Sequence, residues 1–495
     1  MEMLKGTTHW KRTLTGVFLS LSSALLFALA FPPFELWPLV FFGLVPMILA
    51  QHRILPGALS GTAYGIGVGG FFGLYFWDMF RGGPWMMKAL PIMIAVIAGL
   101  AAGRDRQFHR QTGYRWFLLQ GPTVWVGIEQ IRNLIPSVGT WGFAGYALYN
   151  QPWFIQPVSI FGIFGLSFMI LVINYGLALV LIMWIDRRLM AAGSERSLDH
   201  FRGRNQLAAG GTALAVWIGI SLIMFGRGMP DGGRTVHAAA LQPGFKAVSD
   251  EGVFRLIALT EEAALQGAEL VVWPEGALPF DPQEKFTGEL RRLTEERELH
   301  LVIGYGVQAG SSSRNEAVIL TPEGDFLGPY GKTHPVAWSG ETSLTRGPVK
   351  SYATDLGALG MMICYDLDFT DTARETARAG ARLIAVPSFD WGAVAEKHYT
   401  HLVFRAVENR TAVIKADIAF DSALIDPLGR ILERMITPEG QAGLLLADVP
   451  LVEGQTFQGK VGDWFGWISL FGLLAFSAAV SLGSKTSGKN SSGKE

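Results

Sequence analysis

Residues 358–379 read ALGMMICYDLDFTDTARETARA. The stretch opens on an apolar run, Ala358–Ile363, whose length and composition predict a buried β-strand. Thr372 and Glu375 have the spacing of a helix-capping box and predict a helix over Ala373–Ala379. A strand that leads into a helix is typical of an α/β domain. Cys364, the one cysteine of the chain, lies at the end of this strand and excludes an intramolecular disulfide framework.

The same alternation of strand and helix patterns extends in both directions, from Thr235 to about residue 450. Short runs rich in β-branched and apolar residues predict strands, and amphipathic segments between them predict helices. The expected strands are Val236–Leu241, Leu270–Trp273, Leu301–Gly306, Glu316–Thr321, Ala358–Ile363, Leu383–Val386, Ala412–Ala416 and Ser422–Asp426, and the expected helices are Val253–Gln266, Glu284–Arg297, Ala373–Ala379 and Tyr399–Asn409.

Long apolar runs lie before and after this domain, and most are long enough to cross a hydrocarbon core about 30 Å thick. The run 154–185 exceeds a single crossing and predicts an additional re-entrant or interfacial stretch. The tail after Gly483 is rich in Ser, Gly and Lys, which predicts disorder. The expected spans are Leu14–Ala30, Leu36–Ala50, Ala58–Trp77, Ala89–Ala102, Trp116–Ile131, Phe154–Ile185, Leu207–Phe225 and Trp464–Leu482.

Composition and charge divide the 495-residue chain in the same way. Charged residues make up 17% of the chain, against about 25% in ordinary soluble proteins. Residues 1–228 hold 17 Lys and Arg against 8 Asp and Glu, a net charge of +9, whereas residues 229–460 hold 21 against 32, a net charge of −11. We therefore expect a transmembrane region over 1–228 with about seven helices, an acidic α/β domain over 229–460, and a transmembrane helix with a disordered tail over 461–495.

The basic residues also predict the orientation in the membrane. If the spans alternate from a cytoplasmic N-terminus, sixteen Lys and Arg lie on the inside, Lys5, Arg196 and Lys494 among them. The short outer loops hold three, Arg81, Lys88 and Arg132. This asymmetry follows the positive-inside rule and places residues 229–460 on the extracytoplasmic face of a multi-pass cytoplasmic (inner) membrane protein.

Three side chains with catalytic chemistry stand at expected strand ends or in loops. Glu275 lies in WPEGALP, Lys332 in YGKTHPVAW after a Gly- and Pro-rich turn, and Cys364 in MMICYDLDF. A lone cysteine is usually a buried hydrophobe, and a lone Glu or Lys is usually a solvated charge. Together, however, a thiol nucleophile, a carboxylate base and a cation for the oxyanion supply what thiol-dependent acyl transfer needs.

The motifs WPE, GKTH and ICYD resemble the Glu–Lys–Cys triad of the nitrilase superfamily, and their reactive residues are 57 and 32 positions apart in the sequence. The membrane spans around the domain are similar to one branch, the apolipoprotein N-acyltransferase family. Further matches to that family are the aromatic stretch and apolar run Thr140–Asn174, His334, Gly340-Glu341, Arg346-Gly347 and the stretch 388–391, SFDW.

This resemblance implies a nitrilase-like four-layer αββα domain and a two-step reaction. Cys364 would take an acyl chain from a phospholipid as a thioester, and the α-amino group of a diacylglyceryl-cysteine lipoprotein would then receive the chain as an amide. The resemblance further implies that Glu275 is the general base, that Lys332 stabilises the oxyanion, and that Glu341 is a supporting carboxylate.

Several neighbouring residues have both a functional and a structural interpretation. Tyr365 either orients the acyl chain or packs in the domain, and Asp366 either tunes Lys332 or caps the following turn. Trp338, with Leu278 and Phe280, either lines an acyl-chain entrance or fills the core. His334 and His398 lack metal-ligand spacing, so we expect no metal, and the resemblance implies no cofactor. The acidic domain lacks nucleotide-binding loops, so we expect no nucleic-acid partner. We expect a monomer.

Departures from the family pattern leave the acceptor open. The segment between Lys332 and Arg346 is short, Asp366 replaces a Glu, the stretch 388–391 lacks an Asn, and Phe420-Asp421-Ser422 replaces an Asn-Gly-like turn. The alternative function is therefore a membrane-anchored nitrilase-like amidase, or an N-acyltransferase for a different amine. A membrane scaffold or transporter is the alternative from another class. It is disfavoured because the spans hold few ionisable residues, with Glu129 the clearest.

Overall fold

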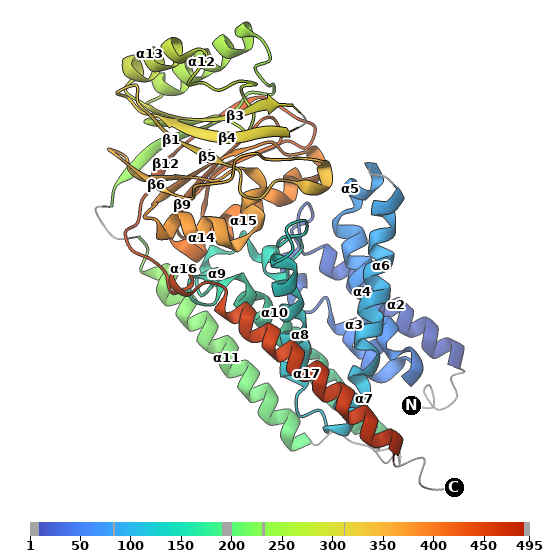
Figure 1. Cartoon of the computed structure of the whole chain (residues 1–495). Coiled ribbons are helices and arrows are strands. Elements are labelled where there is room, and N and C mark those ends of the chain that lie inside the picture. The colour runs from blue at the N-terminus through green and yellow to red at the C-terminus, as the bar shows by residue number, and fades with distance from the viewer. Residues whose placement is uncertain (1–8, 83–84, 191–199, 230–232, 311, 490–495) are drawn as a thin grey trace.

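A computed structural model of the chain describes residues 9–82, 85–190, 200–229, 233–310 and 312–489. A helical region comes first, a domain of two β-sheets follows, and the last helix returns to pack on the helical region (Figure 1). The start of α2 (His9–Ala28) and the end of α17 (Trp464–Lys489) lie at the end of the helical region remote from the sheets (Figure 1). Lys5, Arg196 and Lys494, used above for the orientation, lie outside the described residues.

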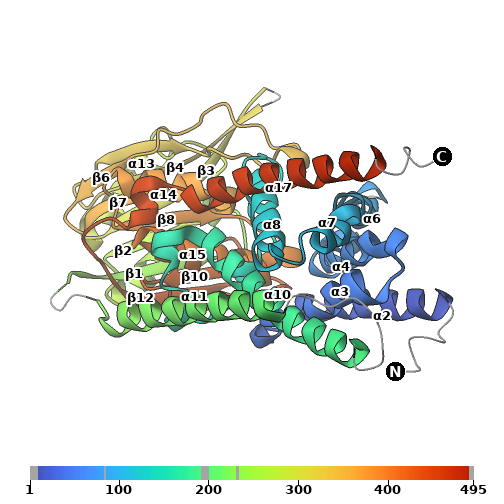
Figure 2. The same ribbon diagram turned by 90° about the horizontal axis from the view of Figure 1, so that it is seen from below.

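The helical region is built from apolar helices that pack through their buried faces. Helices α11 and α17 lie on opposite sides of α8 and α10 (Figure 2). The helical elements are α2 (His9–Ala28), η1 (Trp37–Phe41), α3 (Val45–Leu49), η2 (Ala50–Ile54), η3 (Gly57–Leu59), α4 (Ser60–Tyr75), α5 (Trp77–Gly82), α6 (Trp85–Ala101), η4 (Ala102–Arg104), α7 (Asp105–Gln111), α8 (Phe117–Asn133), η5 (Ala144–Leu148), α9 (Pro152–Ile155), α10 (Val158–Met190), α11 (His200–Gly226) and, at the end of the chain, α17 (Trp464–Lys489).

Five helical segments within the described residues are long and apolar enough to cross a membrane: Trp37–Ile54, Met87–Gln111, Val158–Arg188, Gly203–Gly226 and Trp464–Ser481. The other three expected spans correspond to α2, α4 and α8, which fall short of the same length or apolarity. The long run 154–185 is divided between α9 and α10, and α10 is kinked at Gly162, where φ is +66°. The chain is thus a multi-pass membrane protein.

The sheet domain contains two six-stranded sheets with matching topology. One has the order β12-β1-β2-β3-β4-β5 and the other β11-β10-β9-β8-β7-β6, each with three parallel strands at its centre. The strands are β1 (Thr235–Gln242), β2 (Leu270–Val272), β3 (His300–Ala309), β4 (Ser312–Leu320), β5 (Phe326–Gly331), β6 (Ser351–Thr354), β7 (Gly357–Met361), β8 (Leu383–Ser388), β9 (Ala412–Asp417), β10 (Asp421–Ile425), β11 (Ile431–Ile436) and β12 (Gly443–Pro450).

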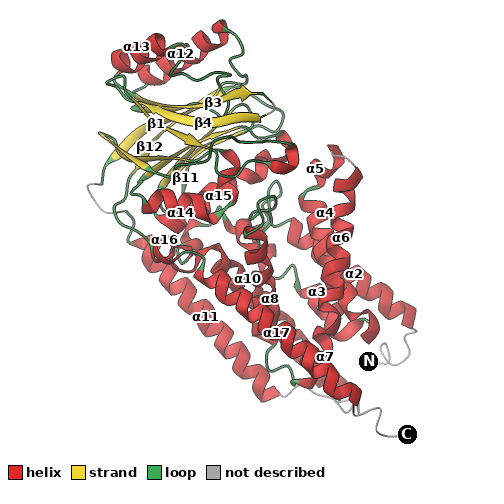
Figure 3. Ribbon diagram, viewed as in Figure 1, coloured by secondary structure: helices red, strands yellow, loops and turns green. Residues whose placement is uncertain are grey.

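Helices cover the outer face of each sheet, so the domain has four αββα layers, as the family resemblance implied (Figure 3). The helices are α12 (Asp250–Leu265), α13 (Thr287–Arg297), α14 (Thr370–Arg378) and α15 (Gly392–Asn409), with the short η6 (Ala337–Ser339), η7 (Cys364–Asp368) and α16 (Phe457–Val461) in connections. Side-chain alternation along β1 shows the layering: Ala238 and Ala240 pack between the sheets, whereas Ala239 and Leu241 pack under α12 and α13.

The second sheet is joined to the helical region by a continuous core. Ile384 and Val386 of β8 pack with Leu402 and Phe404 of α15, and the same cluster continues into residues of α10 such as Ile163. Helices α14 and α15 therefore lie between the second sheet and the helical region, whereas α12 and α13 lie on the far side of the domain (Figure 1).

Two local expectations differ from the structure. Helix α14 begins at Thr370 without a side-chain cap, so the capping box predicted at Thr372 is wrong; Thr372 lies in the first turn, where Asp371 Oδ1 accepts hydrogen bonds from its backbone N–H and its hydroxyl. Helix α17 continues to Lys489, beyond the end predicted at Leu482, so the disorder predicted after Gly483 is wrong for residues 484–489.

Candidate active site

The three predicted catalytic residues follow three different strands and come together at one end of the two sheets. Glu275 follows β2, Lys332 follows β5, and Cys364 lies just after β7, at the start of η7. All three are buried in the fold, with exposed fractions of 8%, 1% and 5%. Burial of an ionisable residue is costly unless it is paired, which makes such a cluster a candidate for function.

Lys332 is held by two carboxylates. Its Nζ donates to Glu275 Oε1 at 2.8 Å and to Glu341 Oε2 at 2.9 Å. Asn315 Nδ2 donates to the same Glu275 oxygen and to Glu341 Oε1, both at 2.6 Å. Glu341 also accepts from the backbone N–H of Val336 at 2.7 Å. The four side chains thus form one hydrogen-bonded group in which each orients its neighbours.

A glycine on β3 allows the Glu275 loop to lie against the sheet. A Cβ atom at Gly304 would lie 2.3 Å from the carbonyl oxygen of Pro274 and 2.9 Å from Cα of Glu275. These separations are far below contact distance, so any side chain at this position would push the loop away. Gly304 is therefore part of what positions Glu275.

Cys364 has a strained backbone that the surrounding structure holds in place. Its φ is +44°, in the left-handed region that residues other than glycine rarely adopt, and such strain often marks functional sites. Asp366 closes the turn: its Oδ2 accepts from the backbone N–H of Ile363 at 2.9 Å and from the Tyr330 hydroxyl at 2.7 Å. Its Oδ1 accepts from the backbone N–H of His334 at 2.8 Å. Asp366 therefore caps the turn that presents the thiol.

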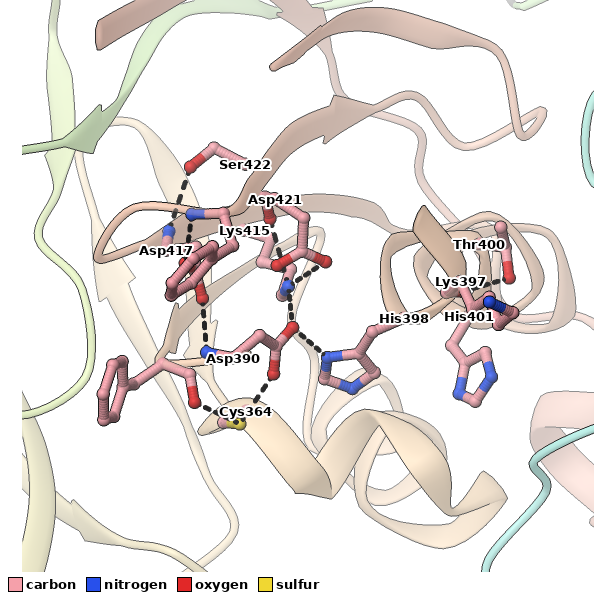
Figure 4. A network of polar contacts seen from close by, with 12 residues as sticks. Cys364, Asp390, Lys397, His398, Thr400, His401, Lys415, Asp417, Asp421 and Ser422 are labelled. Atoms are coloured by element: carbon pink, nitrogen blue, oxygen red, sulfur yellow. Dashed lines mark hydrogen bonds and ion pairs between the residues drawn. The ribbon is translucent and has the colours of Figure 1, made fainter. Parts of the chain in front are cut away.

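A second buried polar group lies beside the cysteine (Figure 4). The Cys364 thiol donates to Asp390 Oδ1 at 3.5 Å. Asp390 Oδ2 accepts from Lys415 Nζ at 2.6 Å and from His398 Nδ1 at 2.5 Å. Lys415 also lies 2.5 Å from Asp421 Oδ2. The nucleophile candidate thus lies between the Glu275–Lys332 group and this Asp390–Lys415 group.

The protonation states follow from burial and pairing. Burial raises the pKa of the Cys364 thiol well above its ordinary value, and Glu275 adds to the rise, so the resting cysteine is a neutral thiol. Burial alone would lower the pKa of Lys332, but Glu275 and Glu341 outweigh it and raise this pKa well above its ordinary value, so the lysine is charged. Burial would raise the pKa of Glu341, yet Lys332 lowers it.

A cavity of about 1240 Å³ connects the site with the helical region. Its lining comes mainly from apolar side chains of α4, α6, α8 and α17, such as Val68, Ile94, Val124 and Phe476. At the sheet-domain end the lining residues include Cys364, the predicted nucleophile. The volume exceeds the roughly 300–1,000 Å³ usual for small-molecule pockets, and apolar walls of this extent suit long hydrocarbon chains.

The structure places some of the supporting residues expected from the sequence at the cavity and others away from it. Tyr365 and Trp338 line the cavity, and Trp338 packs edge-on against Trp391. His334 pairs with Asp371 at 3.1 Å and stacks on Phe369, so its own contacts turn away from Lys332. Leu278 and Phe280, the two other entrance candidates, lie elsewhere: Leu278 is buried in the core under α12 and α13, and Phe280 packs against that core and stacks on Phe286.

Sequence reasoning missed Asn315, Asp390 as a contact of the thiol, and Lys415. Asn315 lies in β4, which the alternation pattern had predicted only from Glu316 onward. Lys415 carried a usable signal, because a lysine inside the apolar run AVIKA of an inner strand must find buried partners.

Among the described residues, three groups bring ligand-type atoms within 4.8 Å of one another: Cys364, Asp390 and His398; Asp368, His398 and His401; and Asp390, Asp417 and Asp421. Cations of the protein already balance these carboxylates. Lys415 lies between Asp390 and Asp421, and His398 contacts both Asp390 and, at 3.4 Å, Asp368. We therefore interpret the three groups as ion-pair clusters.

Two family models match the chain. The carbon-nitrogen hydrolase model matches residues 237–458, and the model of the apolipoprotein N-acyltransferase N-terminal domain matches residues 23–176. Among solved structures, an amidase from Nesterenkonia sp. is 21% identical, with a TM-score of 0.38, over 45% of this chain and 92% of the amidase chain.

Curated relatives match nearly the whole length. The apolipoprotein N-acyltransferase of Geobacter metallireducens is 26% identical over 92% of this chain and 93% of its own. That of Thermotoga maritima is 24% identical over 93% of this chain and 92% of its own, and that of Gloeobacter violaceus is 26% identical over 94% and 95%. The N-terminal-domain model matches the helical region and the carbon-nitrogen hydrolase model matches the sheet domain, in the order expected from the sequence. The chain belongs to the apolipoprotein N-acyltransferase family.

Proposed function

We propose that this chain moves a fatty acyl chain from a phospholipid, through a thioester on Cys364, to the N-terminal α-amino group of a diacylglyceryl-cysteine lipoprotein. One observation carries the proposal: Cys364 lies beside a buried Glu–Lys pair and also faces an apolar cavity walled by membrane helices. Relatives along the whole chain are named for N-acylation of apolipoproteins, which agrees with this geometry.

In the first step the sulfur of Cys364 attacks the ester carbonyl carbon of the phospholipid. Because the resting thiol is neutral, attack needs a base at the moment of bond formation, and Glu275 accepts the proton. The charged Lys332 stabilises the negative oxygen of the tetrahedral intermediate. When the carbon–oxygen bond of the ester breaks, Glu275 returns the proton to the leaving alkoxide, and a lysophospholipid departs.

In the second step the acceptor amine attacks the thioester carbonyl. Glu275 takes a proton from the amine. As the carbon–sulfur bond breaks and the amide product forms, Glu275 returns that proton to the sulfur. Glu341 and Asn315 hold Glu275 and Lys332 in place through both steps. A site at the end of a membrane cavity keeps both lipid chains out of water, where exposure costs about 0.8 kcal/mol per CH₂ group.

The orientation belongs to the same proposal. We place the sheet domain on the extracytoplasmic face of the cytoplasmic membrane and the protein as a monomer with one complete site. The support is the excess of Lys and Arg in the expected inner loops and the position of the start of α2 and the end of α17 at the far end of the helical region (Figure 1). The domain bounds 1–228, 229–460 and 461–495 remain our assignment of the membrane and catalytic parts.

Cys364→Ala tests the proposal directly. Reconstituted wild-type protein with phospholipid and a diacylated lipopeptide is expected to give a triacylated lipopeptide, and Cys364→Ala none, because no thioester can form. Mass spectrometry of the product and of an acyl group on Cys364 provides the measurement. Triacylated product from the alanine variant would overturn the proposal.

A second candidate, amide hydrolysis or acylation of a different amine, is favoured by the short segment between Lys332 and Arg346, which holds only the single turn η6. A short cover would leave room for water or another acceptor. Release of ammonia from amides, or of free fatty acid without lipopeptide acylation, would select this candidate.

A further inference from the structure

Asp390 is the carboxylate in hydrogen-bond contact with the Cys364 thiol. The thiol donates to Asp390 Oδ1 at 3.5 Å, and the neighbouring carbonyl of Phe389 lies 3.9 Å from the same sulfur. Asp390 is 5% exposed and lines the cavity next to Cys364. It belongs to the loop after β8, whereas Glu275 follows β2 in the other sheet, so the two carboxylates reach the cysteine from different sheets.

Three contacts hold Asp390 in place. Its backbone N–H donates to Asp417 Oδ2 at 2.8 Å, and its Oδ2 accepts from Lys415 Nζ and from His398 Nδ1 at 2.6 and 2.5 Å. Its other oxygen is thus left for the thiol (Figure 4). A carboxylate bonded to two cations binds a proton weakly, so Asp390 serves as a hydrogen-bond acceptor and not as a base.

Lys415 supplies a buried positive charge beside Asp390, and its Nζ also donates to the backbone carbonyl of Asp421 at 3.0 Å. It lies on β9, an inner strand of the second sheet, and it is fully buried. Its ammonium contacts Asp390 and Asp421, by ion pairs of 2.6 and 2.5 Å. A buried ion pair is often less favourable than well-packed apolar side chains, so stability alone does not account for a lysine here.

We propose that Asp390 is a further residue of the catalytic centre, which holds the neutral Cys364 thiol in position between turnovers, and that Lys415 and His398 are positioning residues that keep Asp390 ionised and fixed. This inference rests on the proposed role of Cys364 in acyl transfer. At attack the thiol leaves Asp390 and gives its proton to Glu275, while Asp390 keeps its negative charge.

The charge of Asp390 makes two effects separable. A negative group beside the sulfur disfavours the thiolate, yet the same group fixes the sulfur in place. Removing the charge therefore makes the thiol easier to ionise and at the same time less well placed for transfer. The other charged or titratable groups that face Cys364 are Lys246 after β1, Glu275 after β2, Lys332 after β5 with Glu341 beside it, Tyr365 and Asp368 on η7, and His398 on α15.

Asp390→Asn in the full-length protein tests the first part. The midpoint pH of Cys364 alkylation by iodoacetamide is expected to fall by at least about one unit, because a full negative charge leaves hydrogen-bond range of the sulfur. The kcat of lipopeptide acylation is expected to fall about tenfold with little change in KM for phospholipid. Asp448→Asn is the matched control: Asp448 is an exposed carboxylate on β12 in the other sheet, and its replacement should change neither quantity. An unchanged or raised midpoint in Asp390→Asn would overturn the role of Asp390.

Lys415→Met tests whether Lys415 acts as a positioning residue for Asp390. In the wild-type background it should lower the kcat of lipopeptide acylation, because Asp390 loses a partner that fixes it, and in the Asp390→Asn background it should lower kcat little further. An equal fold-loss in both backgrounds would overturn the coupling through Asp390. If the single variant does not fold, Asp390→Asn/Lys415→Met removes both charges together and must match the kcat of Asp390→Asn alone. Absence of triacylated product from the wild type would reject the proposed function. Alkylation of Cys364 needs no lipid, so the alkylation midpoints would still test the role of Asp390 in that case.

Discussion

The two sheet-and-helix halves of the domain have the same topology but opposite surroundings. Helix α13 buries Leu290, Leu293 and Thr294 and presents charged residues to the outside. Helix α15 is buried along nearly its whole length from Val394 to Asn409, because it lies between the second sheet and the helical region. The half that joins the membrane helices also carries Cys364. The half with α12 and α13 thus faces solvent, whereas the half with α14 and α15 connects the site to the cavity.

The largest expected effect separates a site lysine from a surface lysine. Lys332→Met should lower acylation by at least about 10³-fold, because it removes the cation for the oxyanion and leaves Glu275 and Glu341 without their partner. Lys285→Met removes a half-exposed lysine that pairs with Asp250 beside α13, and should leave kcat unchanged. Steady-state acylation assays of both variants provide the comparison. Equal activities would show that the Glu–Lys pair is structural.

The next effect compares ion pairs on the two helical faces. Arg405→Met on α15 breaks a fully buried pair with Glu408 and should cost about 3–5 kcal/mol of unfolding free energy, because Glu408 stays buried without its counter-charge. Arg297→Met on α13 breaks a partly exposed pair with Glu261 and should cost less than about 1 kcal/mol. Thermal unfolding in detergent measures both. Similar losses would mean that the two faces are equally solvated.

A smaller effect concerns the contact between the β3 strand and the Glu275 loop. Gly304→Ala should lower kcat about 10²-fold, because its methyl group would collide with Pro274 and displace Glu275 by a fraction of an ångström to about 1 Å. Gly306→Ala is the matched control two residues along the same strand, where the nearest atom to a Cβ is 3.9 Å away. If Gly304→Ala keeps full activity, Glu275 does not need its present position.

The smallest expected effect is a pH dependence confined to the α15 face. Burial alone would lower the pKa of His398, but Asp390 and Asp368 raise it to about 10, above the value of about 6.5 in the unfolded chain. Its stabilisation is therefore fully present below about pH 6.5 and is lost as pH rises toward 10. The melting temperature of the wild type should fall by several degrees more over this range than that of His398→Asn. Parallel melting curves would contradict this assignment.

The differences between sequence and structure are concentrated at the sheet edges. The eight strands predicted from the sequence are the inner strands of the two sheets, and the four that were missed, β5, β6, β11 and β12, are the four edges. Edge strands are partly solvated and tolerate Pro, Gly and charge, as FLGPYG in β5 and ILERMI in β11 illustrate. The turn predicted before Lys332 is in fact β5, for this reason.

The layout of this protein could be predicted from the sequence: the apolar spans, the α/β domain between them, and the order of Glu275, Lys332 and Cys364. These features depend on local pattern, because hydrophobic periodicity and strand ends are properties of neighbouring residues. Which buried side chains meet the triad depends on tertiary contacts. Asn315 and Asp390 contact the triad, and Lys415 contacts Asp390, across strands and sheets and over 25 to 40 residues of sequence, and no local pattern specifies such a pairing.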